Sequence, residues 1–127
     1  MQPTTFILTA AIGSMLIAQA LKVIRASIKK KKLKLDEISS MNGFPSGHAA
    51  AFTGMLSAIY TLEGFSNLFA ALTVLTIIKF RDILNLKKLS KLANTISKGK
   101  FDPKIGHTTV ELIAGITLAL IFTILIK

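Results

Sequence analysis

Four long apolar runs are the feature of this sequence that most constrains its fold. They cover residues 4–21, 44–62, 65–78 and 107–126, and basic or polar segments separate them. A helix needs about 20 mostly apolar residues to cross a hydrocarbon core of about 30 Å. The two middle runs are shorter than an ideal span, so they require tilt, local thinning of the bilayer or continuation into flanking residues. The pattern predicts an all-α, polytopic membrane helical bundle with about four transmembrane helices, forming a single membrane domain over residues 1–127.

Composition supports a membrane protein. Mean hydropathy is +0.60 although the pI is near 10.2, a combination that is unusual in a soluble basic domain and typical of a membrane protein with basic loops. There is no cysteine, which excludes a disulfide framework and a thiolate metal site. The basic charge is explained by the membrane, so we expect no nucleic-acid partner. The first apolar run lacks a basic n-region and an obvious cleavage site, which favours a retained helix over a signal peptide.

Small residues recur every four positions in three of the apolar runs, and this spacing places them on one helical face. Such stripes are typical of close helix packing in membranes. Because four short spans enclose little core, we also expect the protein to form a homo-oligomer. The stripes are Ala10, Ser14 and Ala18; Ala50, Gly54 and Ala58; and Gly115 and Ala119.

Two basic segments hold fifteen of the sixteen lysines and arginines, seven in residues 22–34 and eight in residues 79–104. We interpret 22–34 as a solvated loop at the lipid surface. Residues 86–96 separate leucines from lysines on opposite faces, which predicts a basic amphipathic helix lying on the membrane. With four spans both segments lie on one side, and the positive-inside rule makes that side cytoplasmic and both termini external.

Two loop-to-helix junctions, residues 42–48 and 106–111, contain both histidines of the chain. Each histidine is expected in the first turn of a membrane helix, on the cytoplasmic side. An ionisable group near lipid is costly, so it indicates function by default. Free N–H groups make a helix start a natural anion site.

At the first junction we expect Pro45 at the first helical position, a hydroxyl from Ser46 and close ligand approach at Gly47. The segment from Pro45 to His48 therefore predicts a site of phosphate size. The alternative is an ordinary loop-to-helix junction with a capping histidine.

Together these motifs resemble the type 2 phosphatidic acid phosphatase superfamily, related to vanadium haloperoxidases, and more closely its divergent branch of small membrane proteins. The resemblance runs from about Ala18 to the C-terminus. It rests on an ordered set of motifs: Ala18-Gln19 with Lys22, Gly43-Phe44-Pro45-Ser46-Gly47-His48-Ala49, Leu62-Glu63-Gly64, Asp82 with Lys87-Lys88, and Gly106-His107-Thr108 with Glu111 and Gly115.

The resemblance implies roles for individual residues. His107 would attack phosphorus, Glu111 would hold its imidazole, and His48 would protonate the leaving oxygen. Ser46 and Gly47 would bind phosphate oxygens. The superfamily's phosphate-binding arginine falls on Phe101. We therefore expect basic side chains to complete the phosphate site, and the candidates are Lys22, Lys87 and Lys88, with Asp82 as a further site residue.

The leading hypothesis is a phosphatase without cofactor that acts on a lipid phosphate or pyrophosphate at the cytoplasmic face, with membrane lipids as its surroundings. The first alternative is a non-catalytic membrane subunit or scaffold that keeps the same fold. The second is a metal protein that uses His48, His107, Glu111 and Asp82. Helix N-termini repel cations, so we predict no metal.

Overall fold

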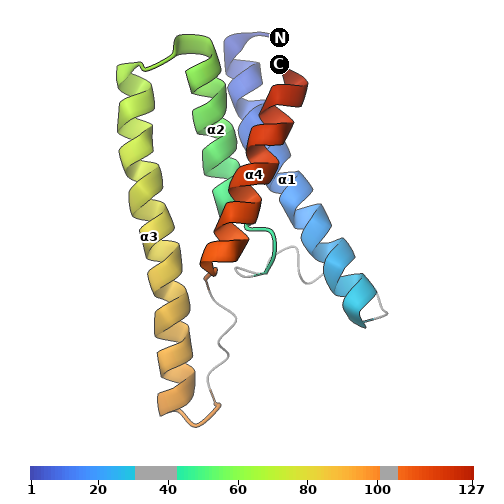
Figure 1. Ribbon diagram of the computed structural model, residues 1–127, viewed down its shortest axis with the longest axis vertical. Helices are drawn as coiled ribbons and strands as arrows, with labels where there is room; N and C mark the ends of the chain where they lie inside the picture. The colour runs from blue at the N-terminus through green and yellow to red at the C-terminus, as the bar shows by residue number, and fades with distance from the viewer. Residues whose placement is uncertain (31–42, 101–105) are drawn as a thin grey trace.

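The computed structural model describes residues 1–30, 43–100 and 106–127, and all of its regular elements are α-helices. This confirms the predicted all-α class. The chain runs alternately down and up, and both termini lie at the same end of the molecule (Figure 1). The four helices are α1 (Pro3–Lys30), α2 (Gly47–Glu63), α3 (Asn67–Ile96) and α4 (Thr109–Ile126).

Helix α2 is the centre of the bundle, because it packs against α1, α3 and α4. Side-chain hydroxyls cap the helix starts. Ser46 accepts the N–H of Ala49 at α2, and Ser66 accepts the N–H of Phe69 at α3. Each cap satisfies a backbone donor that would otherwise lack a partner. The predicted turn between the second and third apolar runs lies at Gly64–Ser66, where α2 ends and α3 begins.

The core is made of small residues, as the four-residue stripes predict. Ala10, Ala18, Ala50, Ala58 and Ala119 are fully buried. Gly54 faces the carbonyl of Ala10 and Gly115 faces the carbonyl of Ser46, and in both places a Cβ would collide with that main chain. Glycine is therefore required for the close approach of α1 and α4 to α2.

Helix α1 is longer than the sequence indicates. The stretch from Lys22 to Lys30 was expected in a solvated loop, but it continues α1. Lys22 lies inside the molecule with 3 % of its surface exposed. Apolar residues such as Val23, Ile24 and Ile28 are interspersed with the basic residues. This spacing allows an apolar face of α1 to continue beyond Leu21. The rest of the basic segment lies outside the described residues.

The third apolar run and the predicted surface helix are one element. Helix α3 continues without interruption through Lys79–Asp82 to Ile96, about 45 Å at ~1.5 Å per residue. A separate amphipathic helix is therefore absent from residues 67–96. The charges at 79–82 do not end a helix, because none of these residues breaks helical geometry.

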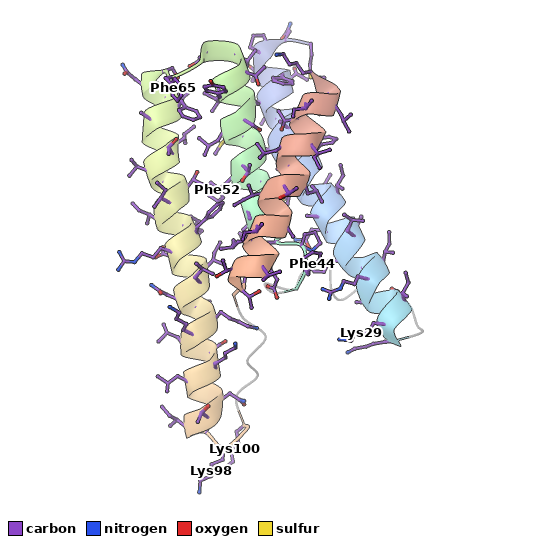
Figure 2. The ribbon with its side chains drawn as sticks, in the orientation of Figure 1. Lys29, Phe44, Phe52, Phe65, Lys98 and Lys100 are labelled. Atoms are coloured by element: carbon purple, nitrogen blue, oxygen red, sulfur yellow. The ribbon has the colours of Figure 1, made fainter. Side chains whose placement is uncertain are left out.

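Two helices, α1 and α4, are long and apolar enough to cross a membrane. Helix α2 has 17 residues, about 25 Å, and α3 carries many charges in its second half. Large apolar side chains cover the outside of the bundle, among them Leu16, Val74 and Ile124. Figure 2 shows Phe65 at the end with the termini, and Lys29, Lys98 and Lys100 toward the opposite end. We call that opposite end the basic end.

Candidate functional site

The start of α4 holds His107 and Glu111 in a fixed arrangement. Oε2 of Glu111 accepts the N–H of Thr108 at 3.2 Å, and Oγ1 of Thr108 accepts the N–H of Glu111 at 3.4 Å. This reciprocal pair is a capping box. The same Oε2 lies 3.0 Å from Nδ1 of His107. The sequence predicted His107 in the first turn of α4, but this residue precedes the N-cap, Thr108.

The pair with Glu111 sets the tautomer of His107. An ionised carboxylate only accepts hydrogen bonds, so Nδ1 carries the proton and the neutral ring has its lone pair on Nε2. The side chain is 1 % exposed. Nε2 is buried and has no hydrogen-bond partner in the described part of the chain. An unpaired buried polar atom is costly, so this nitrogen is a place to look for a ligand.

Burial lowers the pKa of His107 below its usual value, and the charges of Lys22 and His48 lower it further. The hydrogen bond and the charge of Glu111 act in the opposite direction without reversing the shift. The imidazole is therefore neutral at pH 7, with the lone pair of Nε2 unprotonated.

His48 lies beside His107. It is the second residue of α2, it is half-buried, and its ring centroid is 6.0 Å from that of His107, with the ring planes at 58°. Two contacts bring the starts of α2 and α4 together. The N–H of Ser46 donates to the carbonyl of Glu111 at 3.1 Å, and Gly115, which has no Cβ, lets α4 lie close to the Ser46 main chain. The two histidine motifs, far apart in sequence, therefore meet at one level of the bundle.

A pocket of about 70 Å³ opens beside the two rings. Helix α3 provides most of the remaining residues that line this pocket. Lys79, Asp82, Ile83 and Leu86 line it and lie on one helical face, because they follow the spacing i, i+3, i+4, i+7. Asp82 was expected at the site, whereas Lys79 was not. That spacing within a basic stretch is the signal that identifies Lys79.

Gly106 joins α4 to α3 at this pocket. Its φ is +84°, a conformation that favours glycine. A Cβ there would lie 2.6 Å from the backbone nitrogen of Lys87 and 2.7 Å from the carbonyl oxygen of Ile83. Only glycine fits, so the segment that holds His107 is seated directly on the α3 backbone.

Several residues that were predicted to bind phosphate instead make capping or helix-packing contacts. The hydroxyl of Ser46 caps α2, and the residue is fully buried. A Cβ on Gly47 would meet Nε2 of Gln19 at 2.8 Å, so its missing side chain makes room for α1. Pro45 lies before the N-cap and not at the first helical position.

The three lysines that were predicted to bind phosphate lie in different environments. Lys22 is buried, and its charge acts on both histidines. The backbone of Lys87 packs against Gly106, whereas Lys88 is exposed and does not line the pocket. Phe101, where the superfamily has an arginine, lies outside the described residues. Within the described ranges, no group of three or more His, Asp or Glu side chains is placed to hold a metal ion.

The fold and the pocket define a small helical membrane protein with a His–Glu pair facing a second histidine. The chain belongs to the divergent PAP2 family, whose family model matches residues 4–122. This confirms the resemblance drawn from the motifs. The chain is also similar to the uncharacterized membrane protein YuiD of Bacillus subtilis (strain 168), with 29 % identity over 86 residues, 67 % of this chain and 54 % of YuiD. It thus spans about half the length of that curated relative. No solved structure matches the chain.

Proposed function

We propose that this protein is a multi-pass membrane phosphatase that hydrolyses a lipid phosphate or pyrophosphate through a phosphohistidine. One observation carries the proposal: Nε2 of His107 is buried, makes no hydrogen bond within the described residues, and belongs to a ring whose Nδ1 is held by Glu111. A nucleophile oriented by a neighbouring group that fixes its tautomer is the usual arrangement for covalent catalysis.

In the first step, the Nε2 lone pair of His107 attacks phosphorus and an N–P bond forms. The P–O bond to the leaving group breaks, and its electron pair remains on the leaving oxygen. His48 donates a proton to that oxygen, because the anionic phosphate bound beside it stabilises its imidazolium form. Glu111 stabilises the positive charge that develops on the His107 ring. The ring centroids are 6.0 Å apart and both rings line the same pocket, so both histidines can reach one phosphoryl group that enters it.

In the second step, water attacks phosphorus and the N–P bond breaks, with its electron pair returning to Nε2. His48, now neutral, accepts the proton of the water. Inorganic phosphate leaves and both histidines are restored. In each step two positive groups stabilise the negative charge on the phosphoryl oxygens. They are Lys79, which lines the pocket, and Lys22, whose charge also acts on His107.

The decisive experiment is an assay of purified protein against a panel of lipid phosphates and pyrophosphates, with inorganic phosphate as readout. His107→Gln should abolish turnover, and a metal chelator should leave it unchanged. The matched control is Lys88→Gln, because Lys88 is exposed and does not line the pocket. Equal turnover by the parent and His107→Gln would refute the phosphohistidine, and loss of activity with the chelator would favour the metal alternative.

A specific observation favours the second candidate, a non-catalytic subunit or scaffold. The pocket of about 70 Å³ is little more than twice the volume of one water molecule, about 30 Å³, and the Ser46 hydroxyl is used as a helix cap. Absence of turnover across the whole panel, with a folded protein and with His107→Gln indistinguishable from the parent in cells, would establish this alternative.

A further inference from the structure

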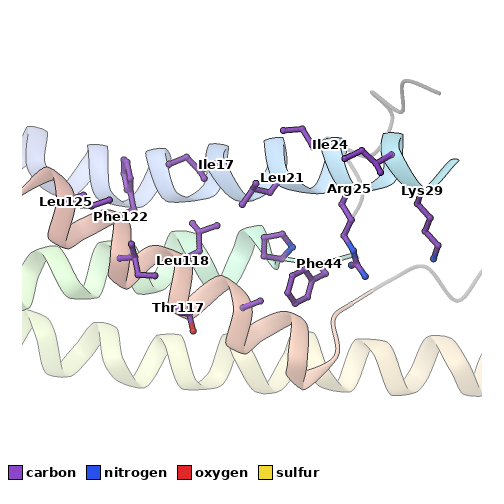
Figure 3. A pocket seen from close by; sticks show the side chains of 14 residues that line it. Ile17, Leu21, Ile24, Arg25, Lys29, Phe44, Thr117, Leu118, Phe122 and Leu125 are labelled. Atoms are coloured by element: carbon purple, nitrogen blue, oxygen red, sulfur yellow. The ribbon is translucent and has the colours of Figure 1, made fainter. Parts of the chain in front are cut away.

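A second and much larger cavity lies on the other side of α4. It encloses about 1050 Å³ between α1 and α4, and the Phe44–Pro45 segment forms part of its wall. Figure 3 shows Leu21 of α1 and Leu118 and Phe122 of α4 on its two sides. Among the described residues, it shares no lining residue with the pocket beside His107. We call it the α1–α4 groove.

The groove is about as long as the hydrocarbon core of a bilayer is thick. On α1 it extends from Ile17 to Lys29, and on α4 from Ala114 to Leu125. The two helices are antiparallel and these stretches are offset, because Phe122 lies against Gly13 and Ala119 packs with Ala18. Together they extend roughly 30 Å at ~1.5 Å per residue, and a hydrocarbon core is about 30 Å thick. Both helices are long and apolar enough to cross a membrane, so the groove would face lipid chains.

One end of the groove is positively charged. Arg25 and Lys29 line it there, and no acidic side chain of the described residues does. The Arg25 guanidinium lies 5.0 Å from the centroid of the Phe44 ring. This cation–π contact holds the guanidinium beside the mouth of the groove. Figure 3 shows Phe44, Arg25 and Lys29 at one end, with Phe122 and Leu125 at the other.

We propose that the α1–α4 groove binds one anionic phospholipid, with an acyl chain along the groove and the phosphate at Arg25 and Lys29. An apolar channel long enough for an extended acyl chain explains the chain, and two cations at a single end explain the anionic headgroup. A second copy of this protein would match the apolar wall but would not explain the cations. The inference goes beyond the proposed function, because the bound lipid is not cleaved and the site lies apart from His107.

Tryptophan fluorescence tests the proposal directly, because the chain contains no tryptophan. Leu21→Trp places one inside the groove, at a position that is 43 % exposed and therefore has room for it. The protein is placed in bilayers of phosphatidylcholine, and a small fraction of lipid with brominated chains is added as quencher. Brominated phosphatidylglycerol should quench at a concentration roughly ten- to thirty-fold lower than brominated phosphatidylcholine, as two cations near a phosphate imply.

Matched variants identify the source of this preference. Arg25→Gln with Lys29→Gln, in the Leu21→Trp background, should abolish it. Lys98→Gln with Lys100→Gln removes the same charge from the far end of α3 (Figure 2) and should preserve it. Val74→Trp places the fluorophore on the exposed surface of α3, where both lipids should quench equally.

Two results would overturn the proposal. Equal quenching by the two lipids at Leu21→Trp would mean that the groove holds ordinary surrounding lipid without selection. Absence of quenching by either lipid, together with cross-linked dimers, would mean that a second copy covers the groove. Phosphatase activity plays no part in these readouts, so failure of the proposed function would leave them unchanged.

Discussion

At the scale of single residues, Glu111 connects the fold to the chemistry. One oxygen accepts both the N–H of Thr108 and Nδ1–H of His107, so the group that starts α4 also orients the imidazole. The consequence is that the structure and the proposed activity depend on different properties of the same side chain. The capping box needs an acceptor of the right length, whereas the proposed reaction needs the negative charge.

Glu111→Gln separates these two properties. The amide oxygen can still accept the N–H of Thr108, so the melting temperature in detergent should change little. Replacing the charged acceptor by a neutral one weakens its bond to the positively charged His107 ring by about 0.5–2 kcal/mol, the difference between charged and neutral hydrogen bonds, so kcat should fall roughly two- to thirty-fold. Glu111→Ala should lose activity and also destabilise the protein by about 0.5–2 kcal/mol, as loss of a cap does. A Glu111→Gln protein with the parent kcat would exclude a role for the charge.

The pKa of His107 predicts how activity depends on pH. The pKa is lowered by burial first, and Lys22 and His48 lower it further. The neutral form is the nucleophile, so activity should be lost as pH falls through this lowered pKa, below the ordinary value of about 6.5. Lys22→Met removes a positive charge, so the pKa should rise and the acid limb of kcat/KM should move to higher pH. A limb that stays in place or moves to lower pH would contradict this assignment.

The sequence predicted that the two histidine motifs meet, and the structure brings them together. The two histidines and Glu111 could be found because helix starts with ionisable residues beside apolar runs are rare and costly. The surroundings of Gly47 could not be found, because they depend on which helix packs against it, and Gln19 of α1 is the neighbour there. The hydroxyl of Ser46 was expected to bind phosphate, whereas it accepts the N–H of Ala49 in its own helix. Lys79 was missed because its role depends on α3 continuing through the charged stretch.

At the scale of the elements, the site exists because three helices meet at one level. The main chains of Ser46 and Glu111 join α2 to α4, and Gly106 seats the start of α4 on α3. The sequence predicted the small-residue stripes, and it placed the starts of α2 and α4 within two residues of where they lie. It did not predict the full lengths of α1 and α3, because charged residues were taken as the ends of helices. Helical geometry tolerates Lys and Arg well, and only solvation limits where they lie.

Gly106 and Gly99 form a matched pair for testing the contact with α3. Their φ angles are +84° and +85°, so alanine is strained by a similar amount at both, about 1–2 kcal/mol. Around Gly99 no atom lies within 4 Å of a Cβ, whereas at Gly106 the α3 backbone lies within 3 Å. Gly106→Ala should therefore displace His107 and abolish activity, and Gly99→Ala should keep it, in parallel assays and thermal unfolding. Equal effects of the two changes would show that the backbone contact is unimportant.

At the scale of the whole molecule, charge and hydropathy are separated along the bundle. The termini and the α2–α3 turn lie at one end, and Lys29, Lys98 and Lys100 lie toward the basic end (Figures 1 and 2). The sequence predicted this separation from the positions of its lysines and arginines, without knowledge of the packing. It could not predict that Lys22 would be buried near the histidines, because a loop was expected there. Lys22 therefore lies near the histidines and not at the membrane surface.

The orientation of the molecule follows from the same separation, and it can be measured because the chain has no cysteine. Lys91→Cys places a single thiol on the second half of α3, toward the basic end, and Glu63→Cys places one at the last residue of α2, at the opposite end; both positions are exposed. The positive-inside rule predicts that the basic end is cytoplasmic. An impermeant thiol reagent should therefore label Glu63→Cys in intact cells and label Lys91→Cys only after lysis. The reverse result would place the histidine pocket on the outer face, and labelling of both sites in intact cells would mean that these helices do not span the membrane.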